Sequence, residues 1–483
     1  MRAQRSVLLL IAAAVLATIA LAGSASAQKT FSRGGSQTIS GGRSTMSTSP
    51  RGDGWYHGSG IGAGVDAFPP GGGQFIDVGP GAPNTVRRER QRATQRGPSG
   101  ATPANERRLV SDEVLTEAAN SVSAAQLDAL QRRYRLTRLE TIPSLLTGTT
   151  LIRWRIPDRR PGATVVAALQ RAGVTAQPNY LFALQQDANA AGTPAQYALA
   201  KLHLLQAHAL AKGDDVRVAV IDSAIDAASP ELAGSIAESF DTLGAPLTPH
   251  KHGTAIAGLI AAHDKLTGAA PDARILAVRA FNPEGAGAKG TTFNILKGLD
   301  WAAAHGARII NMSFAGPDDP AIHRGLVAAH NKGIVLVAAA GNAGPKSPPL
   351  YPAADPNVIA VTATDAGDKL FAQSNRGPHI AIAAPGDRIL VVIPSGGYEV
   401  SSGTSYAAAE VSGIVALMLQ REPSLTPDNA REILLATAKD LGPKGRDPEF
   451  GAGLADAYAA VMAEKPSMTS ASAPAEHNNP GAR

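Results

Sequence analysis

Three polar residues stand beside apolar segments, and their side chains are those that acyl transfer requires. Asp222 ends the apolar run Val218–Ile221, and His252 opens another apolar stretch. Ser405 comes just before the apolar run Ala407–Leu419. A serine hydroxyl becomes a strong nucleophile when a histidine takes its proton and a carboxylate orients that histidine. The sequence therefore predicts a Ser-His-Asp triad for acyl transfer, with Ser405 as nucleophile, His252 as base and Asp222 orienting the base.

A fourth residue offers a donor for the negative charge that acyl transfer develops. Asn342 follows the apolar run Val335–Ala340, so its amide is expected at the end of a buried strand. We expect Asn342 and the backbone N–H of Ser405 to form the oxyanion hole. Each residue taken alone has a simpler explanation, since serine commonly caps helices and asparagine favours turns. His250 and His252 could form a metal pair, but the sequence offers no convincing third ligand.

These residues lie in four short motifs whose order is informative. They are the strand ending in Asp222, His252-Gly253-Thr254, Ala340-Gly341-Asn342 and Gly403-Thr404-Ser405. Over about residues 195–463 the chain resembles the subtilisin-like serine peptidase family, which has the same order of Asp, His and Ser. The resemblance implies a substrate cleft that binds peptide as an added strand. Its predicted walls are Ser313, Phe314, Ala315, Gly316, Ala340 and Gly341.

The chain departs from the family pattern beside two triad residues. Ala224 stands where the family usually has glycine, and Glu410 lies in place of a residue that is often histidine. An alanine is unfavourable if that turn needs a positive φ. These departures leave open an inactive relative that binds peptides without cleaving them.

Apolar runs alternate with helical spacing after residue 216, which predicts the scaffold for these residues. Buried strands are expected at 216–221, 275–278, 309–312, 334–339 and 358–362, with helices at 294–305 and 322–332. This alternation is typical of an α/β fold with a mostly parallel, doubly wound sheet. Lys289-Gly290-Thr291 lacks the order of a P-loop and is expected to be extended beside the cleft.

The remaining segments suggest a secreted precursor. Residues 1–27 have the basic start, apolar run and small residues of a signal peptide, and 28–106 form a Gly-, Ser-, Pro- and Arg-rich linker expected to be disordered. Residues 107–187 predict a β-α-β-β-α-β unit, ferredoxin-like and α+β, which resembles the family's inhibitory propeptide. The catalytic domain is expected at 195–463, and 464–483 as a disordered tail. We expect autoprocessing between Leu184 and Ala200.

Composition narrows the partners. The chain has no Cys, and its net charge of +5 combines +10 over residues 1–187 with −5 over residues 188–483. The predicted catalytic part is therefore mildly acidic and gives no case for nucleic-acid binding. We expect polypeptide substrates, the chain's own propeptide as a partner, no membrane span after signal removal, and a secreted or periplasmic location. No cofactor and no metal are expected; calcium is implied by the resemblance without assignable ligands. A structural envelope protein acting through 28–106 remains the other alternative.

Overall fold

The computed structural model describes residues 106–185, 196–244, 246–284 and 287–463. The predicted signal peptide, nearly all of the predicted linker (28–106) and the predicted tail (464–483) lie outside the described residues. Residues 186–195, which make up most of the predicted processing window, also lie outside the described residues.

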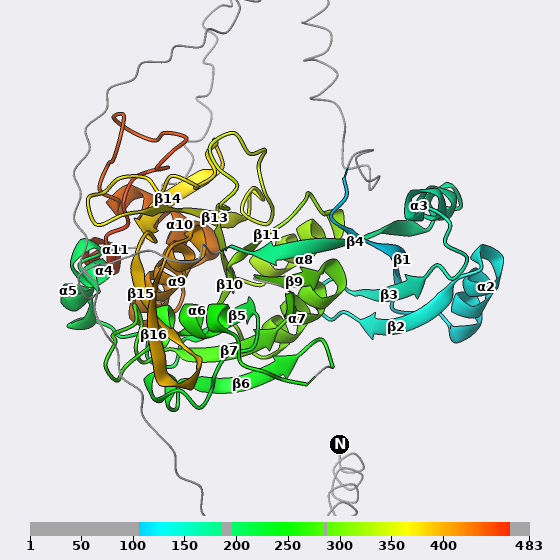
Figure 1. Ribbon diagram of the computed structural model, residues 1–483, viewed down its shortest axis with the longest axis horizontal. Coiled ribbons are helices and arrows are strands. Elements are labelled where there is room, and N and C mark those ends of the chain that lie inside the picture. Colours follow the sequence, from blue (N-terminus) through cyan, green and yellow to red (C-terminus); the bar gives the residue numbers. More distant parts are fainter. Residues whose placement is uncertain (1–105, 186–195, 245, 285–286, 464–483) are drawn as a thin grey trace, which may run out of the picture. The chain divides into compact units, whose positions relative to one another are not determined.

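A parallel sheet forms the centre of the larger part of the structure (Figure 1). Every pairing within it is parallel. The strands follow in the order β14 (Ile380–Pro385), β13 (Val358–Thr364), β12 (Val335–Ala339), β10 (Ile309–Met312), β5 (Arg217–Asp222), β7 (Arg274–Arg279) and β6 (Ile236–Asp241). The predicted α/β fold with a mostly parallel sheet is therefore confirmed.

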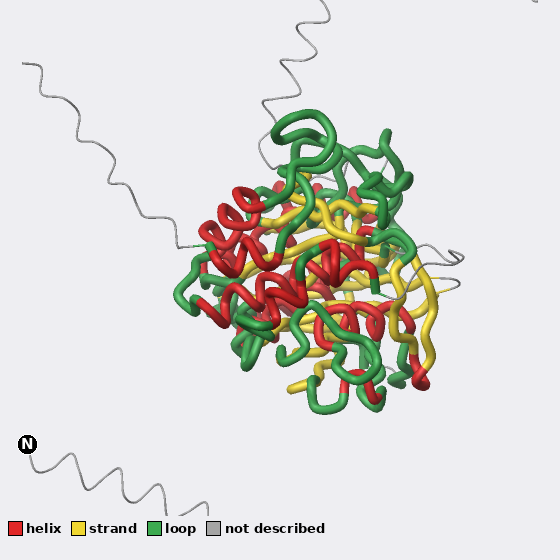
Figure 2. Tube along the Cα trace, turned by 90° about the vertical axis from the view of Figure 1, so that its left-hand side faces the viewer, coloured by secondary structure: helices red, strands yellow, loops and turns green. Residues whose placement is uncertain are grey.

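Helices cover both faces of this sheet, and strand β5 shows why. Its Val218 and Val220 side chains join one core, together with apolar residues of α6 (Lys251–Ala261) and α9 (Thr404–Arg421). Its Ala219 and Ile221 side chains join the other core, with α7 (Thr292–Ala304) and α8 (Pro320–Asn331). Successive side chains of a strand point to opposite faces, so a strand buried on both sides must be apolar throughout. Figure 2 shows the strands enclosed between helices and loops.

Smaller elements complete the larger part. A hairpin of β15 (Ile389–Ile393) and β16 (Gly397–Ser401) packs beside α6. The other elements are α4 (Tyr197–Lys201), α5 (Leu204–His208), η1 (Pro230–Leu232), η2 (Pro394–Gly396), α10 (Pro427–Thr437) and α11 (Ala457–Met462).

Residues 106–185, hereafter the N-terminal subdomain, form an antiparallel sheet with two helices. The elements follow as β1 (Leu109–Ala119), α2 (Ala124–Tyr134), β2 (Thr137–Pro143), β3 (Thr149–Arg155), α3 (Gly162–Arg171) and β4 (Thr175–Leu184). The strand order is β2-β3-β1-β4. Trp154, Ile152 and Leu169 are fully buried in the subdomain's own core.

Strand β4 continues this sheet into the larger part of the chain. Its C-terminal half pairs with β9 (Gly287–Thr291) on one side and with β11 (Phe314–Ala315) on the other, both antiparallel. Strand β9 also pairs with β8 (Phe281–Glu284). The segment Lys289-Gly290-Thr291, expected to be extended, is thus a strand whose partner is β4.

Capping residues begin the two helices that contact the N-terminal subdomain. The hydroxyl of Thr291 accepts a hydrogen bond from Asn294 N at the start of α7. Asp319 caps α8, where Pro320 occupies the first turn. Such side chains satisfy N–H groups that have no partner within the helix. The predicted helices 294–305 and 322–332 therefore begin two residues earlier than their apolar spacing indicated.

Candidate active site

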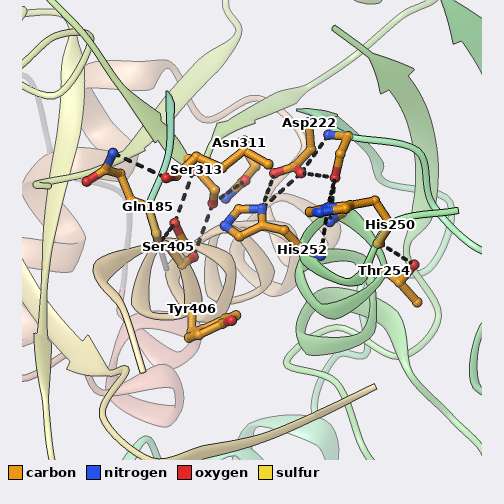
Figure 3. A network of polar contacts seen from close by, with 12 residues as sticks. Gln185, Asp222, His250, His252, Thr254, Asn311, Ser313, Ser405 and Tyr406 are labelled. Atoms are coloured by element: carbon orange, nitrogen blue, oxygen red, sulfur yellow. Dashed lines mark hydrogen bonds and ion pairs between the residues drawn. The ribbon is translucent and has the colours of Figure 1, made fainter. Parts of the chain in front are cut away.

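The central sheet brings Asp222, His252 and Ser405 together although they are far separated in the sequence (Figure 3). Asp222 is the last residue of β5, and His252 and Ser405 are each the second residue of a helix, α6 and α9. All three side chains are fully buried. The carboxyl end of a parallel strand and two helix N-termini therefore meet at one point, where sites in α/β sheets usually lie.

The carboxylate of Asp222 is held by four hydrogen bonds. His252 Nδ1 lies 2.9 Å from each of its oxygens. Ser223 donates to Oδ1 from its backbone N–H at 2.6 Å and from its hydroxyl at 2.9 Å. A carboxylate with this many donors stays ionised and accepts a hydrogen bond from Nδ1–H of the imidazole, which leaves Nε2 as the basic nitrogen.

The hydroxyl of Ser405 is directed away from that basic nitrogen. It donates to the carbonyl oxygen of Gln185 and, at 3.0 Å, to that of Ser313. Nε2 of His252 is buried and has no hydrogen-bond partner among the described residues. Catalytic hydrogen bonds commonly shorten only when the reacting complex forms. The Nε2 lone pair is therefore available inside the site.

The amide of Asn342 is oriented by the residue before the predicted nucleophile. Its Oδ1 accepts from the hydroxyl of Thr404 at 2.8 Å and from Thr404 N at 3.1 Å. Because Oδ1 is occupied in this way, Nδ2 is left as a buried donor without a partner in the described part of the chain. A buried donor without a partner costs about 1–3 kcal/mol of folding free energy. Its retention at this position therefore indicates that the donor has a function in the site.

The end of β4 lies directly over this group of residues. Gln185 N donates to Ser313 O at 3.4 Å, and Gln185 Oε1 accepts from Asn342 N at 3.0 Å. In the β11 pairing Leu184 faces Phe314 and Ala183 faces Ala315. The end of β4 thus lies as the central strand between β9 and β11, the arrangement that β-augmentation produces when a peptide binds.

An aromatic pocket receives the side chain three residues before Gln185. Phe182 is buried, and its ring meets that of Phe314 edge to face with the centroids 5.9 Å from each other. Phe314 in turn packs against Phe281 at 4.9 Å. A Cβ added to Gly316 would lie only 2.2 Å from the Phe182 ring. Glycine is therefore required at this wall for a bulky side chain to enter.

The six residues predicted to bind substrate fall into two groups. Ser313, Phe314, Ala315 and Gly316 contact β4 as described above. Ala340 is buried within the sheet, where its N–H donates to Val361 O. Gly341 has a φ of 108° and donates to the Thr404 hydroxyl at 3.1 Å. This second group sets the path of the backbone before Asn342. A Cβ at Gly341 would meet Asn375 Nδ2 at 2.7 Å, so a larger residue would not fit there.

A cavity of about 590 Å³ opens beside Gln185. Ala315, Asn342 and Leu350 are among the residues that line it, and Lys289 contributes a cation. None of the residues that line it is acidic.

The two departures from the family pattern are accommodated. Ala224 is not among the residues with positive φ, and its carbonyl accepts from His250 N at 2.8 Å. Glu410 lies inside α9, is 4% exposed, and burial raises its pKa to about 8. Neither residue displaces an atom of Asp222, His252 or Ser405.

No metal centre is found in the residues that the structure describes, since no group of three or more His, Asp or Glu side chains there could hold an ion. His250 instead contacts the Ser223 hydroxyl at 3.0 Å. In the same residues no helix is long and apolar enough to cross a membrane.

Sequence reasoning gave no role in the site to Gln185, Ser223 or Thr404, and it considered His250 only as a member of a metal pair. Thr404 stood inside a recognised motif, and Ser223 and His250 lay next to predicted residues, so position was the available signal. Gln185 lies within the predicted processing window, but its contact with Ser405, which joins residues 220 positions apart, was not predicted.

Comparison with known proteins finds a matching family model and several similar sequences. Residues 213–453 match the model of the subtilase family. Thermitase from Thermoactinomyces vulgaris is 35% identical over 275 residues, which are 55% of this chain and 96% of that protein. Subtilisin DY from Bacillus licheniformis is 35% identical over 264 residues, 52% and 92% of the two chains. The minor extracellular protease Epr of Bacillus subtilis (strain 168) is 36% identical over 249 residues, 50% of this chain and 38% of Epr.

A solved structure extends the likeness beyond the matched segment at the level of the fold. Fervidolysin from Fervidobacterium pennivorans, described as a keratinolytic enzyme related to subtilisin, has a TM-score of 0.65 at 24% identity. The alignment covers 76% of this chain and 63% of fervidolysin. The sequence matches, the shared fold and the convergence of the three residues agree, and the chain belongs to the subtilase family of serine endopeptidases.

Proposed function

We propose that this chain is an exported serine endopeptidase in which Ser405, His252 and Asp222 form the catalytic triad. Ser405 Oγ attacks the carbonyl carbon of the substrate while His252 Nε2 takes the hydroxyl proton. His252 then returns the proton to the leaving amine, and water repeats the cycle on the acyl-enzyme. Asp222 stabilises the imidazolium that forms in each step. The buried Asp222–His252 pair, with a basic Nε2 left free, supports these assignments.

The oxyanion is bound in this proposal by Asn342 Nδ2 and by Ser405 N. Ser405 N lies in the first turn of α9, where backbone N–H groups have no partner within the helix and the helix dipole favours negative charge. Thr404 holds the Asn342 amide in the required orientation. These donors are fixed before the reaction begins, which is why their effect on the barrier is large.

The N-terminal subdomain is proposed to be an inhibitory propeptide that the enzyme cuts from itself after Gln185. The observation that carries this is the place of Gln185. Its N–H binds Ser313 O, and its carbonyl oxygen accepts a hydrogen bond from the Ser405 hydroxyl, so the Gln185 carbonyl group lies directly beside the proposed nucleophile. The bond that follows it, between Gln185 and Gln186, lies within the expected processing window.

Export is part of the same proposal. The first 27 residues have the pattern of a signal peptide, and one relative is named an extracellular protease. A propeptide that fills the cleft would keep such an enzyme silent until it has left the cell. Polypeptides are the proposed substrates, with the subdomain itself the first of them.

The test compares three full-length chains expressed without residues 1–27: the natural sequence, Ser405→Ala and Ser424→Ala. Ser424 is exposed and distant from Ser405 in the sequence, so Ser424→Ala is the matched control. We expect the natural chain and the control to yield a product that begins at Gln186, and Ser405→Ala to keep its N-terminal subdomain attached. Intact mass and N-terminal sequencing measure both outcomes.

Processing of the Ser405→Ala chain at the same position would contradict the assignment of the nucleophile. A natural chain that stays full length and does not react with a phosphonate directed at catalytic serines would instead favour an inactive relative. A mature N-terminus far from residue 186 would refute the cut after Gln185 while leaving the triad in place.

A further inference from the structure

His250 is a second histidine beside the proposed triad, and the mechanism above does not use it. It is half-buried and lies directly before α6, two residues ahead of His252 (Figure 3). Its backbone is tied to the loop after Asp222, since His250 N donates to Ala224 O at 2.8 Å. The side chain is thereby held between the strand that carries Asp222 and the helix that carries His252.

One nitrogen of His250 serves two neighbours. Nδ1 accepts from the backbone N–H of His252 at 3.3 Å, which makes His250 the N-cap of α6. The same Nδ1 lies 3.0 Å from Ser223 Oγ. A backbone N–H can only donate, so Nδ1 must carry a lone pair in this arrangement, and the ring is neutral with its proton on Nε2.

Ser223 connects this nitrogen to the carboxylate. Its hydroxyl oxygen accepts from Gly253 N at 3.1 Å, and its single hydrogen is shared between Asp222 Oδ1 at 2.9 Å and the Nδ1 lone pair of His250 at 3.0 Å. Asp222 Oδ1 also lies 2.9 Å from His252 Nδ1. A chain of short contacts therefore runs from His250 through Ser223 and Asp222 to the proposed base.

We propose that His250 is a pH-sensing positioning residue, which must be neutral for the triad to work and which switches the enzyme off when it is protonated. This inference rests on the proposed function of His252 and Asp222. Protonation at Nδ1 replaces the lone pair by N–H, so His252 N loses its cap. It also places a cation at the positive end of the helix dipole.

The second effect of protonation is on the base. A cation next to Asp222 opposes the imidazolium that must form on His252 in the transition state, because two cations then share one carboxylate. The titratable groups that act on His250 are Asp222 from β5 and Lys251 and His252 from α6. Lys251 in turn pairs with Glu399 of β16 at 3.3 Å. Burial lowers the pKa of His250 and outweighs the opposite effect of Asp222, while His252 and Lys251 also lower this pKa, so the neutral, active form prevails at neutral pH.

The experiment measures the pH dependence of kcat/KM for peptide hydrolysis by the full chain after it has been expressed and processed. Active sites are counted with a serine-directed phosphonate at each pH, and each sample is returned to neutral pH to show that the loss is reversible. The variants are His250→Asn, whose amide oxygen caps a helix without titrating, and His250→Ala, which lacks both properties.

Two ionisations are expected on the acid side of the natural profile, so that log kcat/KM falls with a slope approaching two. For His250→Asn we expect a slope of one and activity within about threefold of the natural chain above pH ~8. For His250→Ala we expect the same slope of one but a loss of about tenfold at all pH values, because the cap is missing. A histidine that served only as a structural cap would lower activity without changing the slope.

A natural profile with a slope of one contradicts the proposal whether or not the variants fold. Profiles of the natural chain and His250→Asn that superimpose after scaling overturn it as well. Peptide hydrolysis that persists in Ser405→Ala would refute the proposed triad and, with it, the role of His250. That result needs no His250 variant, so it distinguishes a failure of the proposed function from a failure of this inference.

Discussion

Thr404 and Asn342 form a unit within the proposed oxyanion hole, and their hydrogen bonds assign different effects to each side chain. Asn342→Ala removes the donor itself, so we expect kcat to fall by roughly 10²–10³ with little change in KM, a magnitude established on a subtilisin. Thr404→Val keeps the donor but frees its orientation. We expect a smaller loss, about tenfold in kcat, because the transition state must then recover the geometry.

Steady-state kinetics on a peptide substrate measure both. Equal losses for the two variants would show that the Thr404 hydroxyl acts in some way other than through Asn342. A rise in KM at constant kcat would contradict an effect confined to the transition state.

Glu410 predicts how stability depends on pH. Burial raises its pKa to about 8, against about 4.5 in the unfolded chain, so the folded state holds a proton that the unfolded state releases between these values. Stability must therefore fall as the pH rises from about 5 to above 8. The ionised form costs on the order of 2–5 kcal/mol.

Glu410→Gln should remove this penalty. We expect its Tm to match that of the natural chain near pH ~5 and to exceed it by at least several degrees near pH ~9. Glu432→Gln, an exposed carboxyl on α10, is the control and should change neither value. Tm values that fall equally with pH in the natural chain and Glu410→Gln would contradict the shift.

At the residue scale, the sequence was sufficient to predict the side chains that stand directly beside an apolar element. Asp222, His252 and Ser405 each stand at the end or the start of an apolar element, so their convergence could be predicted. The partners of those residues could not. Gln185, for example, meets Ser405 only because β4 runs between β9 and β11, a pairing that no local pattern encodes.

Among the elements, β11 and the adjacent Gly316 are expected to limit the side chains that the proposed substrate cleft accepts. A Cβ at Gly316 would collide with the ring of Phe182, so Gly316→Ala should exclude a bulky side chain from the position four residues before the cut, counting Gln185 as the first. We expect kcat/KM for a peptide with Phe there to fall by at least tenfold. A peptide with Ala at that position should be hydrolysed as before.

Gly287→Ala on β9 is the matched control, because a Cβ there meets nothing within 4 Å. Loss of both peptides in Gly316→Ala would indicate a distorted strand and would contradict a selective effect of the pocket. Selective loss in the control would point to β9 as the element that sets the preference.

The predicted elements and the observed ones differ where tertiary pairing decides. Strands β5, β7, β10, β12 and β13 are buried on both faces, so their apolar runs located them to within two residues. Strand β9 contains Lys289 and two glycines, and β16 contains Gly397 and Glu399, so neither has an apolar run to signal it. These strands exist because a neighbouring strand supplies their hydrogen bonds, as β4 and β15 do here.

Across the whole molecule, charged side chains join the N-terminal subdomain to α7 and α8. Lys297 pairs with Glu140 at 2.7 Å, and Arg324 pairs with Glu117. Asp300 accepts from Ser144 Oγ and Leu146 N, and Asp319 from Gln177 Nε2 at 2.7 Å. Part of the attraction is therefore electrostatic, and partly exposed pairs of this kind contribute about 0.2–1 kcal/mol each.

The double variant Glu117→Gln/Glu140→Gln should weaken inhibition by the cleaved subdomain by about two- to tenfold, and should reduce its dependence on salt. Inhibition curves at low and high ionic strength measure this. Asp128→Asn removes an ion pair with Arg138 that lies within the subdomain, and serves as control. Unchanged inhibition in the double variant would place the binding energy in the β4 strand instead.

The course of β4 has a consequence for the timing of activation. While the chain is intact, the strand is tethered to the cleft that it fills, and its effective concentration there is high at any dilution. A single cut after Gln185 would make the same contacts bimolecular without altering any of them. Occupancy of the cleft would then depend on how many molecules share a given volume. At high enzyme concentration the cleaved strand would stay bound and the enzyme would be inhibited. On dilution the strand would dissociate and the enzyme would become active.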